Sequence, residues 1–310
     1  MLGPAPLCRC HSPGGDPVIP DFLVPVLYAL VYILVAPLLG GLIAGIDRKV
    51  TARMQGRVGP PILQPFYDVG KLFEKENAVV TVTQNFYVLS YLVFMMVAGA
   101  LFFSGGDLLL VIFAFTLSHI FLVLGAYASY SPYSHVGAER ELLQIIAYEP
   151  MIILTAVGMY MVTKSFYVSS IVSSSVPIIL FLPGIFIGYL IVLTIKLRKS
   201  PFDLSTSHHA HQEIVKGVTT DFTGPNLGKI EIAHWYEYVF LLGVIWLFFA
   251  WNPLIAIIAI IIVYFLEILI DNTTSRVKWQ LMFRSAWIIA GTLGLVNLGV
   301  LYYIGMVVAP

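Results

Sequence analysis

Charged residues are scarce in this chain. Asp, Glu, Lys and Arg make up 11% of its 310 residues, and hydrophobic residues make up 59%. A soluble domain carries about 25% charged residues, so the composition excludes an ordinary soluble protein and indicates that lipid is the main solvent. The formal net charge is zero. Because neither sign of charge is in excess, we expect no nucleic-acid partner.

Cysteine is almost as scarce. The two cysteines are Cys8 and Cys10, whereas an iron–sulfur cluster usually takes about four thiolates. The sequence also lacks a phosphate-binding loop, the dinucleotide motif GxGxxG and the zinc motif HExxH. His208, His209 and His211 lie within four residues, and three such imidazoles cannot all face one ion from a regular helix. We therefore expect no metal and no cofactor in this chain, so that redox chemistry would belong to partner subunits.

Long apolar runs dominate what is present. A membrane span needs about 20 apolar residues, and the sequence contains eight such runs, which predicts an all-α membrane protein with about eight transmembrane helices. We expect residues 1–22 to form an N-terminal extension and residues 23–310 a single polytopic membrane domain. The predicted spans are 23–46, 86–104, 108–130, 142–163, 177–197, 232–250, 252–271 and 284–307.

The basic residues separate sharply between the two sides of these spans. All of the 17 Lys and Arg residues except Arg9 and Lys164 fall in the loops on one side. By the positive-inside rule, that side is cytoplasmic and both termini lie outside the cell membrane. Long loops are uncommon unless they are functional, so this face is predicted to dock a partner. The predicted cytoplasmic loops are 47–85, 129–141, 196–231 and 271–284.

Several ionisable residues lie in or at the ends of the predicted spans. A charge in hydrocarbon costs about 2.5–3.5 kcal/mol on insertion scales, so such residues are functional candidates. Acids at different depths, together with histidine, are what a proton path requires. The alternative is that they extend to the interface or form ion pairs, and that the histidine makes a structural hydrogen bond. The residues concerned are Glu139, Glu141, Glu149, Glu231, Glu237, Glu267 and Asp271, with His119 and His234.

Two of the predicted loops contain distinctive motifs. In the first, Arg57-Val58-Gly59-Pro60-Pro61 forces an extended turn, and an amphipathic helix is expected from Leu63 to Lys75 at the membrane interface. This helix carries Gln64, Asp68 and Lys71. The second loop begins with Ser200-Pro201-Phe202-Asp203-Leu204 and contains Glu213 and Asp221. A third motif, Ala147-Tyr148-Glu149, lies within the fourth span.

These three motifs, in this order, resemble the eight-span subunit that anchors the peripheral arm of respiratory complex I and of energy-converting NiFe hydrogenases. The resemblance covers about residues 25–300 and implies an ion-pumping complex in which this subunit couples electron transfer to antiporter-like membrane subunits. Iron–sulfur clusters and a NiFe centre would then belong to docked cytoplasmic subunits. It implies a proton path through Glu139, Glu141, Glu149, Glu213, Asp221, Glu237 and Glu267, and docking through Arg57, Gly59, Pro60, Gln64, Asp68, Lys71, Pro201, Phe202 and Asp203.

Local departures favour one branch of this family. Complex I members usually carry GPNRVGP, whereas this chain keeps only the second half of that run, in Gln55-Gly56-Arg57-Val58-Gly59-Pro60. The segments 138–144 and 205–213 are closer to hydrogenase-type members, which favours a ferredoxin-dependent hydrogenase. The alternatives are the equivalent subunit of a sulfur-reducing or quinone-reducing complex, and a purely structural anchor. A self-sufficient transporter would show internal repeats, and the two halves show none.

Overall fold

The computed structural model describes residues 23–76, 82–205 and 216–308. Within these ranges the regular structure is helical, with one isolated β-bridge between Asp107 and Tyr167. Among the residues discussed above, Cys8, Cys10, the histidines at 208, 209 and 211, and Glu213 lie outside the described ranges. The prediction of an all-α membrane protein is confirmed.

Seven helices in the described ranges are long and apolar enough to cross a membrane. The seventh, Trp279–Ile304, is continuous through α11 (Trp279–Ile289), the π-helical turn η2 (Ala290–Gly294) and α12 (Leu295–Val308). The other six are α1 (Leu23–Met54), α3 (Val82–Phe103), α4 (Leu108–Tyr127), α5 (Pro132–Thr163), α9 (Gly224–Phe248) and α10 (Pro253–Thr273).

The predicted span at 177–197 is the one that differs. It is divided into α7 (Ile178–Phe181) and α8 (Pro183–Lys196), with Leu182 between them, and it follows the short helix α6 (Val168–Ser173). Fourteen helical residues reach about 21 Å, less than the roughly 30 Å of a hydrocarbon core. The figure of eight spans therefore holds only if this short apolar helix is counted. Because α8 ends inside the protein, its last residue, Lys196, is buried and is not the loop residue that the hydropathy pattern predicts.

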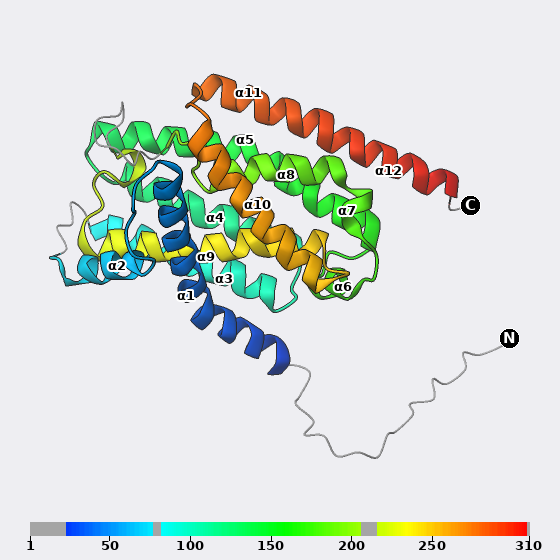
Figure 1. The fold of residues 1–310 in the computed structure, drawn as a ribbon, viewed down its shortest axis with the longest axis horizontal. Helices are drawn as coiled ribbons and strands as arrows, with labels where there is room; N and C mark the ends of the chain where they lie inside the picture. The colour runs from blue at the N-terminus through cyan, green and yellow to red at the C-terminus, as the bar shows by residue number, and fades with distance from the viewer. Residues whose placement is uncertain (1–22, 77–81, 206–215, 309–310) are drawn as a thin grey trace, which may run out of the picture.

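The helices pack around α9. This helix contacts α1, α2 (Gln64–Glu74), α3 and α10, while α5 lies against α4, α8 and α11. Figure 1 shows α5, α8 and α9 running along the long axis, with α11 and α12 along one flank. We call the end that carries α2, the connection after α8 and the α10–α11 link (residues 274–278) the loop end. At this end α9 begins eight residues before the predicted span, so Glu231 and His234 lie inside a helix.

Two close approaches fix α1 against the rest of the bundle. A Cβ atom at Gly40 would lie 2.3 Å from the Trp235 carbonyl oxygen, and one at Gly45 would lie 1.9 Å from that of Ile62. Only glycine allows the backbones to come so near. Between α1 and α9, the Tyr32 hydroxyl donates to the Tyr236 carbonyl at 3.2 Å, and the Tyr236 hydroxyl donates to the carbonyl of residue 33 at 2.6 Å.

Helix α2 is the predicted amphipathic helix. It buries Pro65 and Val69 and leaves Tyr67 largely exposed. The Phe66 ring packs against Trp235 of α9 at 5.1 Å between centroids. On its polar side, Asp68 accepts from Arg48 of α1 at 2.8 Å. Helix α2 is therefore held by both α1 and α9 at the loop end.

Candidate functional site: a buried charged cluster

Three ionisable side chains from different helices meet in the interior. His119 of α4, Lys196 of α8 and Glu237 of α9 are at most 5% exposed. The Glu237 Oε1 atom lies 3.0 Å from His119 Nε2 and 3.2 Å from Lys196 Nζ, and Lys196 Nζ lies 2.8 Å from His119 Nε2. Glu237 is thirteen residues into α9, about 20 Å from the start of the helix. A charge at this depth requires partners, and here each group provides them for the other two.

The second ring nitrogen of His119 defines its protonation. His119 Nδ1 lies 3.0 Å from the Phe115 carbonyl oxygen, which can only accept, so we assign the first ring proton to Nδ1. Nε2 then has two possible states. Without a proton it accepts from Lys196, and with one it donates to Glu237. The same geometry therefore accommodates one additional proton on the imidazole without rearrangement of the helices.

A second ion pair extends this group towards the loop end. Arg198 donates to Glu141 of α5 at 3.5 Å, and Arg198 has a left-handed backbone with φ of 53°. Glu141 and Arg198 line the same internal space as His119, Lys196 and Glu237. We call these five residues the buried cluster. Its charges come from α4, α5, α8, α9 and the connection after α8, so its geometry depends on the packing of all of these elements.

Aromatic rings surround the buried cluster. The Lys196 ammonium lies 4.3 Å from the ring centroids of both Phe115 and Tyr148, which favours the charged amine. The Tyr91 ring lies edge-on to His119 at 5.8 Å and to His234 at 6.2 Å. Tyr91 Oη, Tyr148 Oη and His234 Nε2 are buried and have no hydrogen-bond partner among the described residues. Such groups normally bond protein or water, so they mark where a hydrogen-bonded chain could continue.

One further buried acid lies apart from the cluster. Glu267 of α10 is 2% exposed, and its Oε1 atom accepts from Thr194 of α8 at 3.2 Å. Its other oxygen has no partner among the described residues. Asp271, one turn nearer the loop end, belongs to a different network. Glu267 therefore lies between the hydrocarbon interior and the polar contacts at the end of α10.

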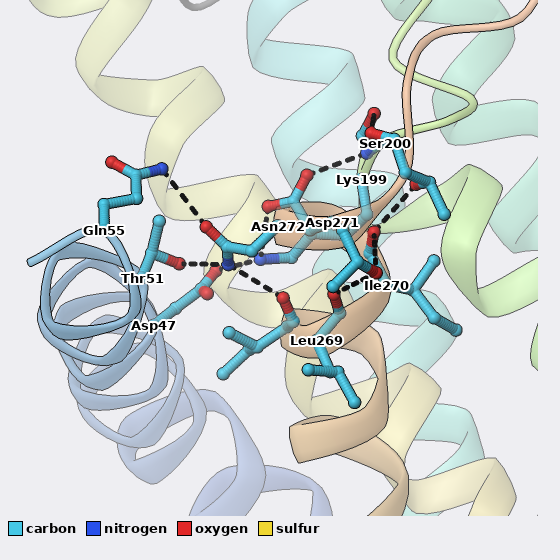
Figure 2. Close-up of polar contacts among 12 residues, drawn as sticks. Asp47, Thr51, Gln55, Lys199, Ser200, Leu269, Ile270, Asp271 and Asn272 are labelled. Atoms are coloured by element: carbon cyan, nitrogen blue, oxygen red, sulfur yellow. Dashed lines mark hydrogen bonds and ion pairs between the residues drawn. The ribbon is translucent and has the colours of Figure 1, made fainter.

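That network joins α1 to α10 at the loop end (Figure 2). Lys199 pairs with Asp47 of α1 and, at 3.4 Å, with Asp271 of α10, which also accepts from the Ser200 amide at 2.8 Å. Asn272 donates to Thr51 at 3.3 Å and accepts from Gln55 at 3.1 Å. We call this set the α1–α10 junction; it consists of Asp47, Thr51, Gln55, Lys199, Ser200, Asp271 and Asn272.

The described residues contain no group of three or more His, Cys, Asp or Glu side chains that could hold a metal ion. The buried cluster pairs its acids with amines and a guanidinium, which compete with a cation for the carboxylates. The chemistry that these side chains can perform is therefore the holding and transfer of protons.

Comparison with known proteins agrees with this architecture. A family model described as NADH dehydrogenase matches residues 26–302. The chain belongs to the NADH dehydrogenase family. It is 25% identical to hydrogenase-4 component C of Escherichia coli K12, over 85% of this chain and 92% of that protein. It is 30% identical to a membrane subunit of the NADH-quinone oxidoreductase of Bacillus cytotoxicus, over 74% and 76% of the two chains.

A solved structure is also similar. A chain of the membrane-bound sulfane sulfur reductase, an archaeal respiratory membrane complex, matches with a TM-score of 0.77 and 27% identity, covering 88% of this chain and 99% of that one. The protein is thus a multi-pass membrane subunit of the complex I-like and hydrogenase-type complexes. The resemblance inferred from the loop motifs is confirmed.

Within this family member, the acids predicted for the proton path occupy three kinds of position. Glu141 and Glu237 meet in the buried cluster, and Glu267 is buried separately. Glu149, next to the buried Tyr148, is half-buried, and Glu139 is exposed near the start of α5. Asp221 is half-buried in the turn between η1 (Gly217–Thr219) and α9. The structure thus brings two of the six described acids into one site.

The predicted docking residues all lie at the loop end. Asp68 bonds Arg48 and Gln64, and Arg57 bonds Gln55. Asp203 is buried and pairs with Arg276, and the Phe202 carbonyl accepts from Gln144 at 2.7 Å. Lys71 is exposed, and Gly59, Pro60 and Pro201 are half-buried. Asp68 and Asp203 therefore have structural partners in addition to any docking role.

Lys196 and Arg198 are the site residues that the sequence did not assign. Both belong to a predicted loop and count there as ordinary basic residues. The available signal was their place directly after an apolar run that proline shortens, which leaves the two charges inside the bundle. His119 was identified as a mid-span histidine, but its partners lie 77 and 118 residues away in sequence and cannot be derived from local spacing.

Proposed function

We propose that this chain anchors a cytoplasmic iron–sulfur and catalytic arm to the membrane and couples its electron transfer to ion movement. The complex would be a ferredoxin-dependent, membrane-bound hydrogenase. Iron–sulfur clusters and a NiFe centre would lie in the docked subunits, and antiporter-like membrane subunits would move H⁺ or Na⁺. In this arrangement the loop end faces the cytoplasm and both termini face outwards.

The buried cluster is the observation that carries this proposal. Three ionisable groups within 3.2 Å of one another can hold one added proton in more than one arrangement, and the Arg198–Glu141 pair connects them to the connection after α8. A change of charge in an arm docked at the loop end would shift the proton affinity of the nearest pair first. The cluster would respond by taking up or releasing a proton.

The energy for this step would come from the docked arm. Moving one charge across 100 mV takes about 2.3 kcal/mol, and the sequence contains no nucleotide motif that could supply it. Glu139, Asp221 and Glu213 would feed protons from the loop end, and Glu149 and Glu267 would receive them further in. This assignment rests on the resemblance and on the positions of these residues along the helices.

A sulfur-reducing complex is the second candidate, favoured by the structural similarity to the sulfane sulfur reductase. The two candidates differ in the partner rather than in this chain. A docked subunit with both CxxC pairs of a NiFe site would support the hydrogenase, and loss of some of these cysteines would support another acceptor. Purification of the intact complex, with metal analysis and sequencing of its subunits, distinguishes them.

The coupling role is tested with Glu141→Gln and Glu237→Gln in the intact complex. Glutamine keeps the shape of the side chain but cannot release a proton. Both variants should assemble with a full complement of subunits, while proton movement in sealed vesicles falls by about 100-fold or more. If both variants moved protons normally, the coupling role would be excluded and the purely structural anchor would remain.

A further inference from the structure

A polar cavity lies at the loop end, outside both the buried cluster and the α1–α10 junction. Its volume is about 490 Å³, within the 300–1,000 Å³ typical of ligand sites. The lining residues come from α5 (Arg140), from the connection after α8 (Asp203 and Leu204) and from the link into α11 (residues 276–280). Three segments that are distant in sequence therefore form one hollow.

The lining of this cavity is basic. Its charged side chains are Arg140, Arg276 and Lys278, with Asp203 as the acid. Asp203 pairs with Arg276, so the lining carries a net positive charge. Residues 278–280 are the N-terminus of α11, where Lys278 is the N-cap and makes no side-chain cap bond. The first turn of a helix adds positive potential, and the cavity is therefore complementary to an anion.

The position of the cavity indicates where the anion comes from. The cavity lies where the apolar helix α10 ends and α11 begins, and the two helices diverge from this point (Figure 1). Trp279 on its wall is 40% exposed, and tryptophan is enriched at the membrane–water boundary. Below it, Phe265 of α10 and Leu281 of α11 are more than half exposed. A polar head held here would have its acyl chains beside apolar helix faces.

We propose that this cavity binds the phosphate head group of an anionic phospholipid. The basic side chains recognise the phosphate, and the exposed faces of α10 and α11 accommodate the chains. Basic pockets between membrane helices are a known setting for such lipids. The bound lipid would tie the α10–α11 link to α5 and to the connection that leads into the buried cluster.

Native mass spectrometry of the delipidated whole complex, titrated with phosphatidylglycerol, tests this proposal. The variant carrying Arg140→Gln and Lys278→Gln should bind one lipid fewer than the parent, or bind it about tenfold or more weakly. Lys278→Arg should restore most of the binding in the presence of Arg140. The matched control carries Arg53→Gln and Lys75→Gln, two exposed charges at the loop end that do not line the cavity; it should bind as the parent does.

Further conditions separate a lipid from other anions. Phosphatidylcholine and excess inorganic phosphate should not displace the bound lipid, because one lacks net charge and the other lacks acyl chains. Displacement by inorganic phosphate would show a free-anion site and overturn the proposal. Equal lipid binding by the Arg140/Lys278 variant and its control would overturn it too. So would binding that appears only after the docked arm is removed, since a protein partner would then be the occupant.

Discussion

The buried cluster and the α1–α10 junction contain similar residues but differ in what surrounds them. In the junction, Lys199 lies between two aspartates whose side chains are 18% and 28% exposed, and Asp271 also accepts from a backbone amide. In the cluster, Glu237 is buried against Lys196 and His119, two groups that can exchange protons with it. Carboxylates bonded to backbone hold chain positions, whereas carboxylates surrounded by titratable groups can pass protons.

Removal of Lys196 should have the largest effect on stability. Lys196→Met leaves Glu237 as a buried anion with only His119 beside it, and breaking a buried pair costs about 3–5 kcal/mol. The double change Lys196→Met with Glu237→Gln removes both charges and should recover most of the thermal stability of the complex. It should not recover proton movement. If the single variant were as stable as the parent, the cluster would not be the tightly coupled unit described above.

Asp271→Asn tests the junction and should have a moderate effect. It weakens the contacts to Lys199 and to the Ser200 amide, and a hydrogen bond to a charged group contributes about 1.5–3 kcal/mol. Partial exposure of Asp271 places the loss at the lower end of this range. Limited proteolysis should cut faster near residues 197–205, and each transferred electron should still move the usual number of protons. A loss of coupling in fully assembled complexes would contradict the structural role given to the junction.

Tyr91→Phe sharpens the comparison because it separates packing from proton transfer. The Tyr91 hydroxyl is buried without a partner among the described residues, so its removal should change stability by less than about 1 kcal/mol. If Tyr91 continues the chain from His119 to His234, the rate of proton movement should fall several-fold at unchanged assembly. Phe102→Leu on the same bundle is the packing control, and it should affect stability more than rate.

The smallest effect is expected at Asp68 on α2. Burial raises the pKa of this carboxyl, but the hydrogen bonds from Arg48 and Gln64 outweigh burial and lower the pKa below its ordinary value of 3.8. The stabilisation is therefore present above that ordinary pKa and is lost as the pH falls towards the lowered one. Both partners are more than 40% exposed, so Asp68→Asn should cost less than about 1 kcal/mol near pH 7. Thermal melting of parent and variant should converge as the pH falls below about 4.

Most of the fold could be predicted because lipid imposes a simple rule on length and hydropathy. The errors occur where protein replaces lipid. α8 is short because Pro183 begins a new helix after Leu182, and the surrounding helices cover its ends. α5 and α9 extend past the predicted spans at the loop end, because polar residues there bond to other segments rather than to water alone.

The site was predictable only in part. Glu141 and Glu237 could be singled out, because acids in apolar helices are costly. Their partners could not be derived, because Lys196 and Arg198 lie in a predicted loop and the contacts join helices far apart in sequence. The α1–α10 junction was missed for the same reason, although Asp271 was identified as a polar residue at the end of its span.

The most direct measurement is the number of protons moved per electron in sealed vesicles containing the whole complex, driven by a low-potential dye. Glu237→Gln and Asp271→Asn would be compared in preparations matched for subunit content. The account predicts a ratio near zero for Glu237→Gln and an unchanged ratio for Asp271→Asn. An unchanged ratio in Glu237→Gln, or an equal loss in both variants, would contradict the claim that the buried cluster couples electron transfer to proton movement.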